Sequence, residues 1–549
     1  MRGTADLRAW LKLALIPMVG ILAACQGNSN NNTADEVVTG SVVAAPVSGA
    51  SVVAKDVHGN QVAGPVTTAA DGSYSLTIPD SDLSSDLIIT ASGGTFDDEA
   101  SGLSGRSAGQ LTAYVAGGSL GTGDAVHLTP ASTIVADMVS EQGMTLSVAN
   151  SAFESAFGFA ADTGVAPTDA TAPMAGAEQA QLLAGLRAAT FSQLAMDMGL
   201  SSEQQFDLLP ALARDLADGD LDGEDATGPV TVTGATLLPA DIRNRFTQAM
   251  VNFRAGGNDN TGLSNDMIGT LPFAKVALTS SYKLEYMPSM MAAMEGKTGF
   301  TLRITDRATH LPVSGQMVTL MPMMHMAAHE HATPVEGCTE TATAGDYACT
   351  LYYLMGSTMM SGMSMGYWQL QVMVGGMAGE SATFYPQVMM AMGDTAKAVL
   401  KGQSDMIAGM AMSGGMAMDQ NRSYYLFKAG LTGMSGSYDL DLFVAAKESM
   451  MSYPPVFVGT TLSSGTAYEL TVASMSVEVS TDASTWLAAT DNGNGHWTVS
   501  GITGLSDGVA GTVYVRLTIN GEQKTSDGAA PMGDGSNDYA SFTLTPGGM

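Results

Sequence analysis

Cysteine, positive charge and long apolar runs are all scarce in this sequence. The 549 residues include 3 cysteines and 22 lysines and arginines, against 53 aspartates and glutamates, so the formal net charge is −31. Nucleic acids and anionic membrane surfaces attract basic proteins, and this balance argues against both as partners. No apolar run reaches the ~20 residues that a membrane-spanning helix needs. Beyond its first residues, the chain is therefore expected to be soluble.

Motifs of the common enzyme classes are also missing. The sequence has no glycine-rich phosphate loop after a strand, no nucleophile elbow and no His-Glu-x-x-His run. The segment His329–His331 is too compressed for a zinc-protease helix, and no spacing of serine, histidine and aspartate singles out a catalytic triad. We therefore predict that the protein is not an enzyme and has no catalytic residues.

The first 24 residues have the pattern of a secretion signal. Three basic residues precede the apolar run Leu13–Leu22, which has the length of a signal-peptide core. The sequence Leu22-Ala-Ala-Cys25 resembles the bacterial lipobox, in which the cysteine becomes the lipidated first residue of the mature protein. This resemblance implies lipidation of Cys25, and an ordinary signal peptide with a chance cysteine is the alternative. Gln26 stands where an aspartate would resemble an inner-membrane retention signal, so the outer membrane is favoured, at its periplasmic face or the cell surface.

Several domains are expected after the signal peptide, because a domain usually holds ~100–200 residues. Hydrophobic residues make up 45% of the chain, and its 64 glycines favour short strands joined by tight turns. The predicted fold class is mainly β and multidomain, with Ig-like or transthyretin-like β-sandwiches and a helical block between the first and the second. The predicted segments are a signal peptide (1–24), an Asn/Ser-rich tether (25–36), a first β-sandwich (37–111), a helical domain (112–272), a Met/His-rich β domain (273–420) and a C-terminal Ig-like β-sandwich (421–549).

The first β segment resembles a known module. The stretches Gly40–Val43, Pro46–Val53 and Asp71–Leu76 look like the carboxypeptidase-regulatory-like sandwich over most of residues 37–111. The resemblance implies a seven-stranded spacer or attachment module without catalysis.

Helix-forming residues dominate the second segment. We expect Thr129 to be the N-cap of a helix whose first residue is Pro130. Further helices are expected at Ala177–Met198, Phe206–Leu216 and Ile242–Phe253.

An acidic loop lies between two of these helices. Four of its aspartates are candidate calcium ligands: Asp218, Asp220, Asp222 and Asp225. The spacing of the first three, with Gly223 after them, matches the start of a calcium loop. The twelfth position, however, is Pro229 instead of the bidentate glutamate. A weak calcium site and a solvated acidic loop therefore both remain open.

Methionine is concentrated in the third segment. Residues 287–418 hold 24 of the 39 methionines, and three histidines lie close together among them at residues 325, 329 and 331. A thioether is a soft, neutral ligand that suits Cu(I), and imidazole binds copper in both oxidation states. Methionine loses no proton on binding and forms no disulfide. The predicted metal ligands are Met321, Met323, Met324, His325, Met326, His329, His331, Met359, Met360, Met363 and Met365.

The alternation of a β-strand determines which of these side chains share a face. We expect Met321, Met323 and His325 on one face, Met324 and Met326 on the other, and His329 and His331 projecting together. Methionine is also an adaptable core filler and a sticky contact surface, which is the alternative interpretation of the tract. Three methionines are expected in the core on this ground: Met317, Met373 and Met389.

The order of motifs in this segment resembles the YtkA-like family of small envelope domains. The matching stretches are Gly299–Asp306, Pro312–Val318, Met321–Met326, Gly345–Tyr347 and Met365–Leu370. The family resemblance implies an Ig-like sandwich and an association with copper handling. The chain departs from the pattern by inserting His329–His331, two cysteines and the run from Met359 to Met365, so the resemblance does not fix a ligand set.

The two cysteines of the third segment are Cys338 and Cys349. In the oxidising cell envelope two such cysteines most often form a disulfide, and a metal–thiolate pair is the alternative. The last segment alternates again as strands do, with a turn predicted at Asn520–Gly521. There His496, next to Trp497, is interpreted as a structural residue.

Together these patterns predict an envelope-anchored lipoprotein that binds Cu(I), and Ag(I) as well, for copper capture, buffering or delivery. Its expected partners are the membrane through the N-terminal lipid, metal ions and an envelope protein. The alternative function is a modular surface or adhesion lipoprotein without a metal role.

Overall fold

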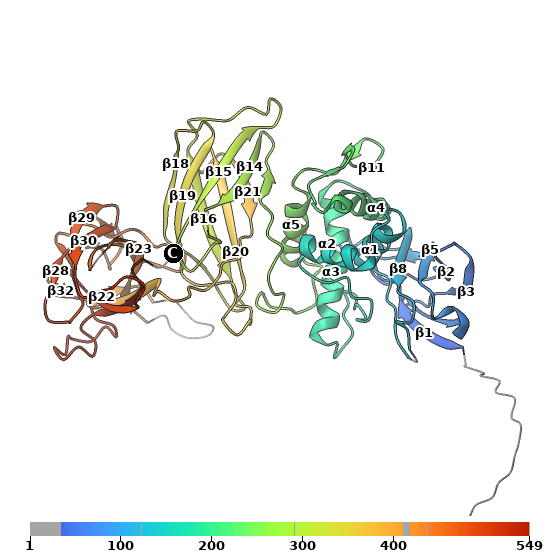
Figure 1. Ribbon diagram of the computed structural model, residues 1–549, viewed down its shortest axis with the longest axis horizontal. Helices are drawn as coiled ribbons and strands as arrows, with labels where there is room; N and C mark the ends of the chain where they lie inside the picture. The colour runs from blue at the N-terminus through green and yellow to red at the C-terminus, as the bar shows by residue number, and fades with distance from the viewer. Residues whose placement is uncertain (1–34, 122, 290, 410–417, 435, 548–549) are drawn as a thin grey trace, which may run out of the picture.

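The computed structural model describes residues 35–121, 123–289, 291–409, 418–434 and 436–547. The signal peptide and Cys25 lie outside these residues, as does nearly all of the tether. The described chain is mainly β, with several separate sheets and one group of helices, which confirms the predicted mainly β, multidomain class. From the N-terminus to the C-terminus, a β–helical body, a central β-sandwich and a C-terminal β body follow one another in a row (Figure 1).

The N-terminal β part contains a four-stranded sheet in the order β3-β2-β5-β8 and two two-stranded pairs, β1-β4 and β6-β7. Its strands are β1 (Glu36–Ser41), β2 (Ser51–Asp56), β3 (Gln61–Thr67), β4 (Ser73–Ile78), β5 (Leu87–Ser92), β6 (Thr95–Phe96), β7 (Arg106–Ser107) and β8 (Gln110–Val115). Strand β8 extends beyond residue 111, so the boundary predicted there falls inside a strand.

Five α-helices follow this sheet in the described chain, and α1 packs against its edge strand β8 (Figure 1). They are α1 (Pro130–Ser140), α2 (Leu146–Phe157), α3 (Gln179–Asp197), α4 (Gln205–Asp215) and α5 (Ile242–Ala255). Short strands lie between α4 and α5, namely β9 (Glu224–Asp225), β10 (Gly228–Pro229), β11 (Thr231–Thr233) and β12 (Thr236–Leu237). One continuous hydrophobic cluster joins sheet and helices, including Leu111 and Ile134. The two segments predicted as separate domains therefore share one core.

The start of α1 is as predicted. Thr129 is the N-cap and Pro130 the first helical residue, and the side chain of Thr129 accepts a hydrogen bond from the backbone N–H of Ser132. The Ser132 hydroxyl in turn accepts one from the Thr129 N–H, which completes a capping box. The sequence pattern does not predict α2, which begins after the N-cap Thr145.

The central sandwich consists of two sheets that pack face to face. One has the order β13-β14-β15-β19-β18 and the other β17-β16-β20-β21. The strands are β13 (Val276–Leu278), β14 (Tyr282–Pro288), β15 (Gly296–Asp306), β16 (Val318–His325), β17 (Glu330–Ala332), β18 (Val335–Glu340), β19 (Asp346–Tyr353), β20 (Tyr367–Val374) and β21 (Glu380–Phe384). Leu302 and Leu351 from the first sheet meet Met324, Trp368 and Leu370 from the second in one buried core.

The C-terminal body also has two main sheets, β22-β23-β24-β30-β29 and β28-β27-β31-β32, with β33 paired to β31. The strands are β22 (Lys397–Ile407), β23 (Gln420–Met434), β24 (Ser437–Lys447), β25 (Thr461–Leu462), β26 (Leu470–Thr471), β27 (Met475–Ser480), β28 (Leu487–Ala488), β29 (Thr490–Gly493), β30 (His496–Ile502), β31 (Gly511–Ile519), β32 (Glu522–Gln523) and β33 (Ala540–Leu544). Because β22 pairs with β23, the C-terminal sheet begins before the boundary predicted at residue 420.

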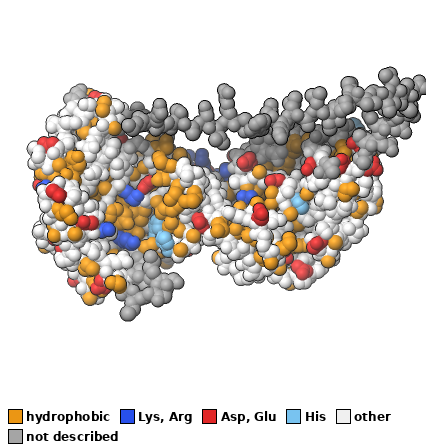
Figure 2. Space-filling model, turned by 90° about the horizontal axis from the view of Figure 1, so that it is seen from below, with side chains coloured by type: hydrophobic (Ala, Val, Ile, Leu, Met, Phe, Trp, Pro, Cys, Tyr) orange, Lys and Arg blue, Asp and Glu red, His pale blue; other side chains and the backbone are white. Residues whose placement is uncertain are grey.

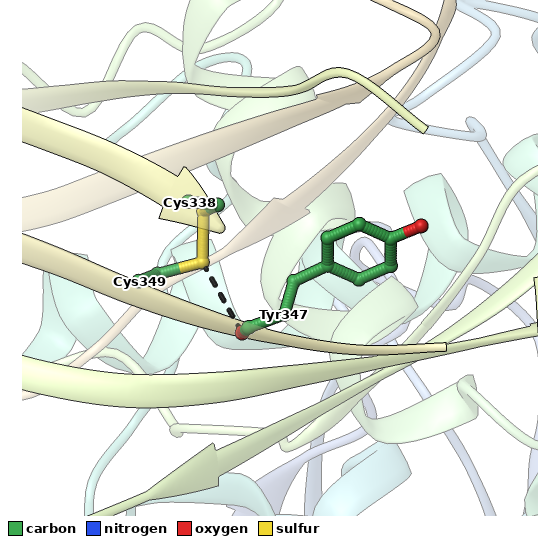
Figure 3. Close-up of a disulfide and its surroundings, with 3 residues drawn as sticks. All are labelled: Cys338, Tyr347 and Cys349. Atoms are coloured by element: carbon green, nitrogen blue, oxygen red, sulfur yellow. Dashed lines mark hydrogen bonds between the residues drawn. A yellow bond between two sulfur atoms is a disulfide. The ribbon is translucent and has the colours of Figure 1, made fainter. Parts of the chain in front are cut away.

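Cys338 and Cys349 form a disulfide, as predicted (Figure 3). The two residues lie directly opposite each other on the antiparallel strands β18 and β19, with 4.1 Å between their Cα atoms. The Sγ atom of Cys349 lies 3.5 Å from the carbonyl oxygen of Tyr347 on the same strand.

Among the described residues, no helix is both long and apolar enough to cross a membrane.

Candidate metal site at the methionine-rich end of the sandwich

Strand β16 presents its methionines to two different surroundings. Met321, Met323 and His325 lie on the outer face of their sheet, and Met321 is 38% exposed. Met324 points inward and is fully buried in the core of the sandwich. The predicted sharing of faces is confirmed within β16, and Met326 lies beyond the end of that strand. Met324 does not lie with the accessible ligands, because its sulfur is enclosed by hydrophobic side chains.

Both ring nitrogens of His325 already have hydrogen-bond partners. Nδ1 lies 2.7 Å from a carboxylate oxygen of Glu330 and Nε2 lies 2.8 Å from the side-chain oxygen of Gln369. The ring also stacks on Tyr367, with 4.8 Å between the ring centroids. A metal ion could reach His325 only by displacing Glu330 or Gln369, two partners that the sequence did not indicate.

His331 has a different setting on the inner face of the same sheet. It is 6% exposed and lies edge-on to Trp368, with 5.4 Å between ring centroids. Burial lowers the pKa of His331, so the ring is neutral at pH 7. Its Nδ1 donates a hydrogen bond to the carbonyl of Ala332 at 2.8 Å, which leaves the lone pair on Nε2.

The ring of His329 lies beside that of His331, as predicted, with 6.4 Å between their centroids. His329 is exposed, and its backbone carbonyl accepts a hydrogen bond from the N–H of Met326 across the turn. The two histidines therefore belong to one hairpin, with one imidazole in water and the other buried and neutral.

Loops that are distant in sequence meet at the end of the sandwich where β16 terminates. They are the β14–β15 loop (289 and 291–295), the β16–β17 turn (326–329), the β19–β20 loop (354–366) and the β21–β22 loop (385–396). We call this region the methionine-rich end. It lies at the lower end of the sandwich in Figure 1.

Backbone contacts connect these loops to one another. Met389 donates its N–H to Ala293 and accepts one from Glu295, and Ser357 donates its N–H to Val388. The connection to the β16–β17 turn is made at Gly366, where an added Cβ would fall 2.0 Å from the carbonyl oxygen of His325. Only glycine permits so close an approach at this point.

The loops of the methionine-rich end expose their thioethers to solvent. Six methionines there are between 41% and 76% exposed: Met291, Met359, Met360, Met363, Met389 and Met392. Seen from below, hydrophobic side chains gather on the underside of the central region with a histidine beside them (Figure 2). Three further methionines pack partly against the sandwich core: Met326, Met355 and Met365.

Two expectations about core methionines are wrong. Met317 is 67% exposed and Met389 is 54% exposed, so neither is a core residue, and Met373 is only partly buried. Met291, Met389 and Met392 are not among the ligands predicted from the sequence. Their membership of the methionine-rich tract is the available signal, but only the fold shows that their loops lie at the same end of the sandwich as the loop of Met359 and Met363.

The acidic loop after α4 does not gather its carboxylates around one point. Asp218, Asp222 and Asp225 accept hydrogen bonds from the backbone of Asp220, Glu224 and Thr227, and Asp220 accepts one from Leu221. Within the described ranges, no three His, Cys, Asp or Glu side chains lie close enough to hold a metal ion. Calcium binding here stays a prediction without a converged ligand set.

No protein-family model and no curated protein matches this chain in sequence comparison. The resemblances to the carboxypeptidase-regulatory-like and YtkA-like families therefore stay predictions from the residues quoted for them.

Proposed function

We propose that this protein is an envelope-anchored, non-enzymatic lipoprotein that binds Cu(I), and Ag(I) in the same way, at the methionine-rich end of its central sandwich. Copper capture, buffering or delivery would follow from such a site. The observation that carries the proposal is the meeting of four loops at the end of the sandwich where β16 terminates, because three of these loops expose six methionines and the fourth connects β16 to the strand of His331.

The chemistry of the donors supports a soft, monovalent ion. Thioethers bind Cu(I) well and bind Ca²⁺ or Mg²⁺ poorly, because hard cations prefer oxygen ligands. Long, unbranched methionine side chains on loops can also adjust to an ion that is not held rigidly. His329 and the neutral His331 offer nitrogen donors that suit either oxidation state of copper.

The Cys338–Cys349 disulfide supports the proposed location. Disulfides persist in oxidising compartments such as the bacterial periplasm, where free thiolates are poor permanent ligands. Methionine keeps its ligand character there.

A competition titration against a Cu(I) chelator tests the proposal on the mature protein in detergent. We expect the variant with Met359→Leu, Met360→Leu and Met363→Leu to lose at least about tenfold in Cu(I) affinity, or to bind fewer ions. The matched control replaces Met174, Met434 and Met532 by leucine, since these methionines are also exposed but lie elsewhere. Met324→Leu is a second control inside the sandwich, because its sulfur is buried.

The contribution of the methionines to Cu(I) affinity should be the same at about pH 7 and at about pH 5.5, because thioethers carry no proton. These two values bracket the ordinary histidine pKa. If neither pH gives competition, or if the loop variant binds copper as the controls do, the exposed methionines form a contact surface for another protein. The adhesion function would then be favoured, since six exposed methionines also make an apolar patch.

A further inference from the structure

Arg187 on α3 carries a positive charge that no side chain of the described chain neutralises. Its guanidinium lies 4.6 Å above the ring of Phe159, and no described residue forms an ion pair or a hydrogen bond with it. Burial lowers the pKa of Arg187, and no nearby carboxylate offsets this effect. A partly buried and unpaired guanidinium is costly unless an anion approaches it.

The guanidinium borders a cavity of about 270 Å³ between α1, α3 and the segment after α2. Most of the lining is apolar, with Phe159, Leu183 and Phe191 among its walls. The first residue of α1, Pro130, also lines the cavity, so the positive end of that helix dipole faces the same space. Asp162 also lines the cavity, and its carboxylate accepts the N–H of Gly164 at 2.7 Å.

We propose that this cavity binds a small hydrophobic monocarboxylate. The carboxylate would pair with Arg187 near the start of α1, and the apolar body would lie against Phe159, Leu183 and Phe191. Arginine suits this role because its fork of N–H donors matches a carboxylate. The site is independent of the methionine-rich end and goes beyond the metal function.

The volume limits the size of the ligand. A cavity of about 150 Å³ accommodates benzene, so 270 Å³ fits an aromatic ring with a carboxylate or a medium acyl chain. Benzoate and octanoate are therefore suitable probes, and benzyl alcohol and 1-octanol are their uncharged counterparts.

Calorimetric titration of the mature protein tests the proposal. We expect benzoate or octanoate to bind with a dissociation constant below about 1 mM and to raise the melting temperature of the N-terminal body. The alcohols should bind at least about tenfold more weakly, because they lack the charge. Arg187→Met keeps the aliphatic stem and should weaken carboxylate binding by a similar factor.

Two further variants separate loss of the site from loss of the fold. Ala184→Leu fills the cavity from α3 and should also abolish binding. Arg214→Met, which removes an arginine that donates to the carbonyl of Thr231 instead, should bind octanoate as the wild type does. Cu(I) binding should be the same in all three variants. The proposal is overturned if neither acid binds at millimolar concentration, if the alcohols bind equally well, or if folded Arg187→Met retains wild-type affinity.

Discussion

Neighbouring methionines of β16 have opposite surroundings, although their side chains are chemically identical. Met323 lies on the outer face, whereas Met324 is enclosed with Trp368 and Leu370. A thioether can bind a metal only if an ion can reach its sulfur. The capacity to bind copper therefore belongs to a position in the fold and not to the residue type alone.

His331 should make the central sandwich sensitive to acid. Its pKa is lowered by burial, so its contribution to stability is complete above the ordinary pKa of about 6.5 and is lost as the pH falls through the lowered value. The values pH 7.5 and pH 5.5 lie on either side of the ordinary histidine pKa of about 6.5. Between them we expect the free energy of unfolding of the wild type to fall by on the order of 1 kcal/mol more than that of His331→Phe. Denaturant unfolding followed by tryptophan fluorescence measures this difference.

The control for this prediction is His310→Asn, which removes an exposed histidine of the same sandwich. That variant should lose as much stability on acidification as the wild type. Equal acid sensitivity of His331→Phe and the wild type would show that His331 does not control the response.

At the scale of strands, the β18–β19 pair holds one edge of the first sheet of the sandwich. Strand β18 is the terminal strand of that sheet, and its pairing with β19 shifts register near Gly337. The disulfide crosses the pair just beyond this irregularity. A covalent link at this position limits separation of the edge strand where the hydrogen-bond ladder is interrupted.

Replacing both cysteines by serine should destabilise the central sandwich. The cross-link closes a loop with a sequence separation of 11 residues, for which the chain-entropy model gives about 3 kcal/mol. We expect thermal unfolding of the sandwich at a lower temperature and earlier proteolysis within β18. An unchanged melting temperature, with the disulfide shown by mass spectrometry in the wild type, would contradict the prediction.

At the scale of the whole molecule, an aromatic contact joins the central sandwich to the C-terminal body. Tyr352 of β19 stacks on Phe443 of β24, with ring centroids 4.2 Å apart and planes within 3°. Beside it, His496 of β30 lies between Asp441 of its own body and Glu336 of β18, at 3.2 Å from each. The interface thus combines a buried aromatic contact with a histidine–carboxylate cluster. We call this cluster of His496, Asp441 and Glu336 the clasp.

This clasp should weaken in alkali. Hydrogen bonds to Asp441 and Glu336 raise the pKa of His496 to about 9, so its stabilising contribution is complete below about pH 6.5 and is lost as the pH rises through about 9. The raised pKa corresponds to a stabilisation on the order of 2 kcal/mol, a figure that allows for the partial screening of this group by water. The raised pKa of His496 lies between pH 7 and pH 10. Small-angle scattering at these two values should therefore show a more extended molecule at pH 10.

The scattering profile of the His496→Gln variant should change less between the two pH values than that of the wild type, because the variant lacks the titrating group. A wild-type scattering profile that is identical at the two pH values would exclude a role of the clasp in the arrangement of the two bodies.

Attachment to the membrane is a property of the whole molecule that depends on one residue. Cys25→Ala should abolish lipidation and release the protein from the membrane fraction, since the lipobox resemblance places the acyl chains on that sulfur. Fractionation and metabolic lipid labelling measure this, with Cys338→Ser as the control for loss of a cysteine. An acylated, membrane-bound Cys25→Ala protein would rule out this anchor.

The sequence by itself determined features with local causes. The N-cap at Thr129, the alternation along β16 and the turn at Asn520–Gly521, where both φ values are positive, follow from neighbouring residues. The disulfide was predictable because few cysteines leave few pairings. The mainly β class followed from the same kind of short-range pattern repeated along the chain.

The tertiary structure alone decided which distant residues meet. Met291, Met359 and Met389 belong to three different loops, and sheet topology brings them to one end of the sandwich. The clasp between Glu336 and His496 and the shared core across residue 111 also depend on packing between segments far apart in sequence. Such contacts leave no periodic trace in the chain, because a side chain's burial depends on what packs against it and not on its sequence neighbours.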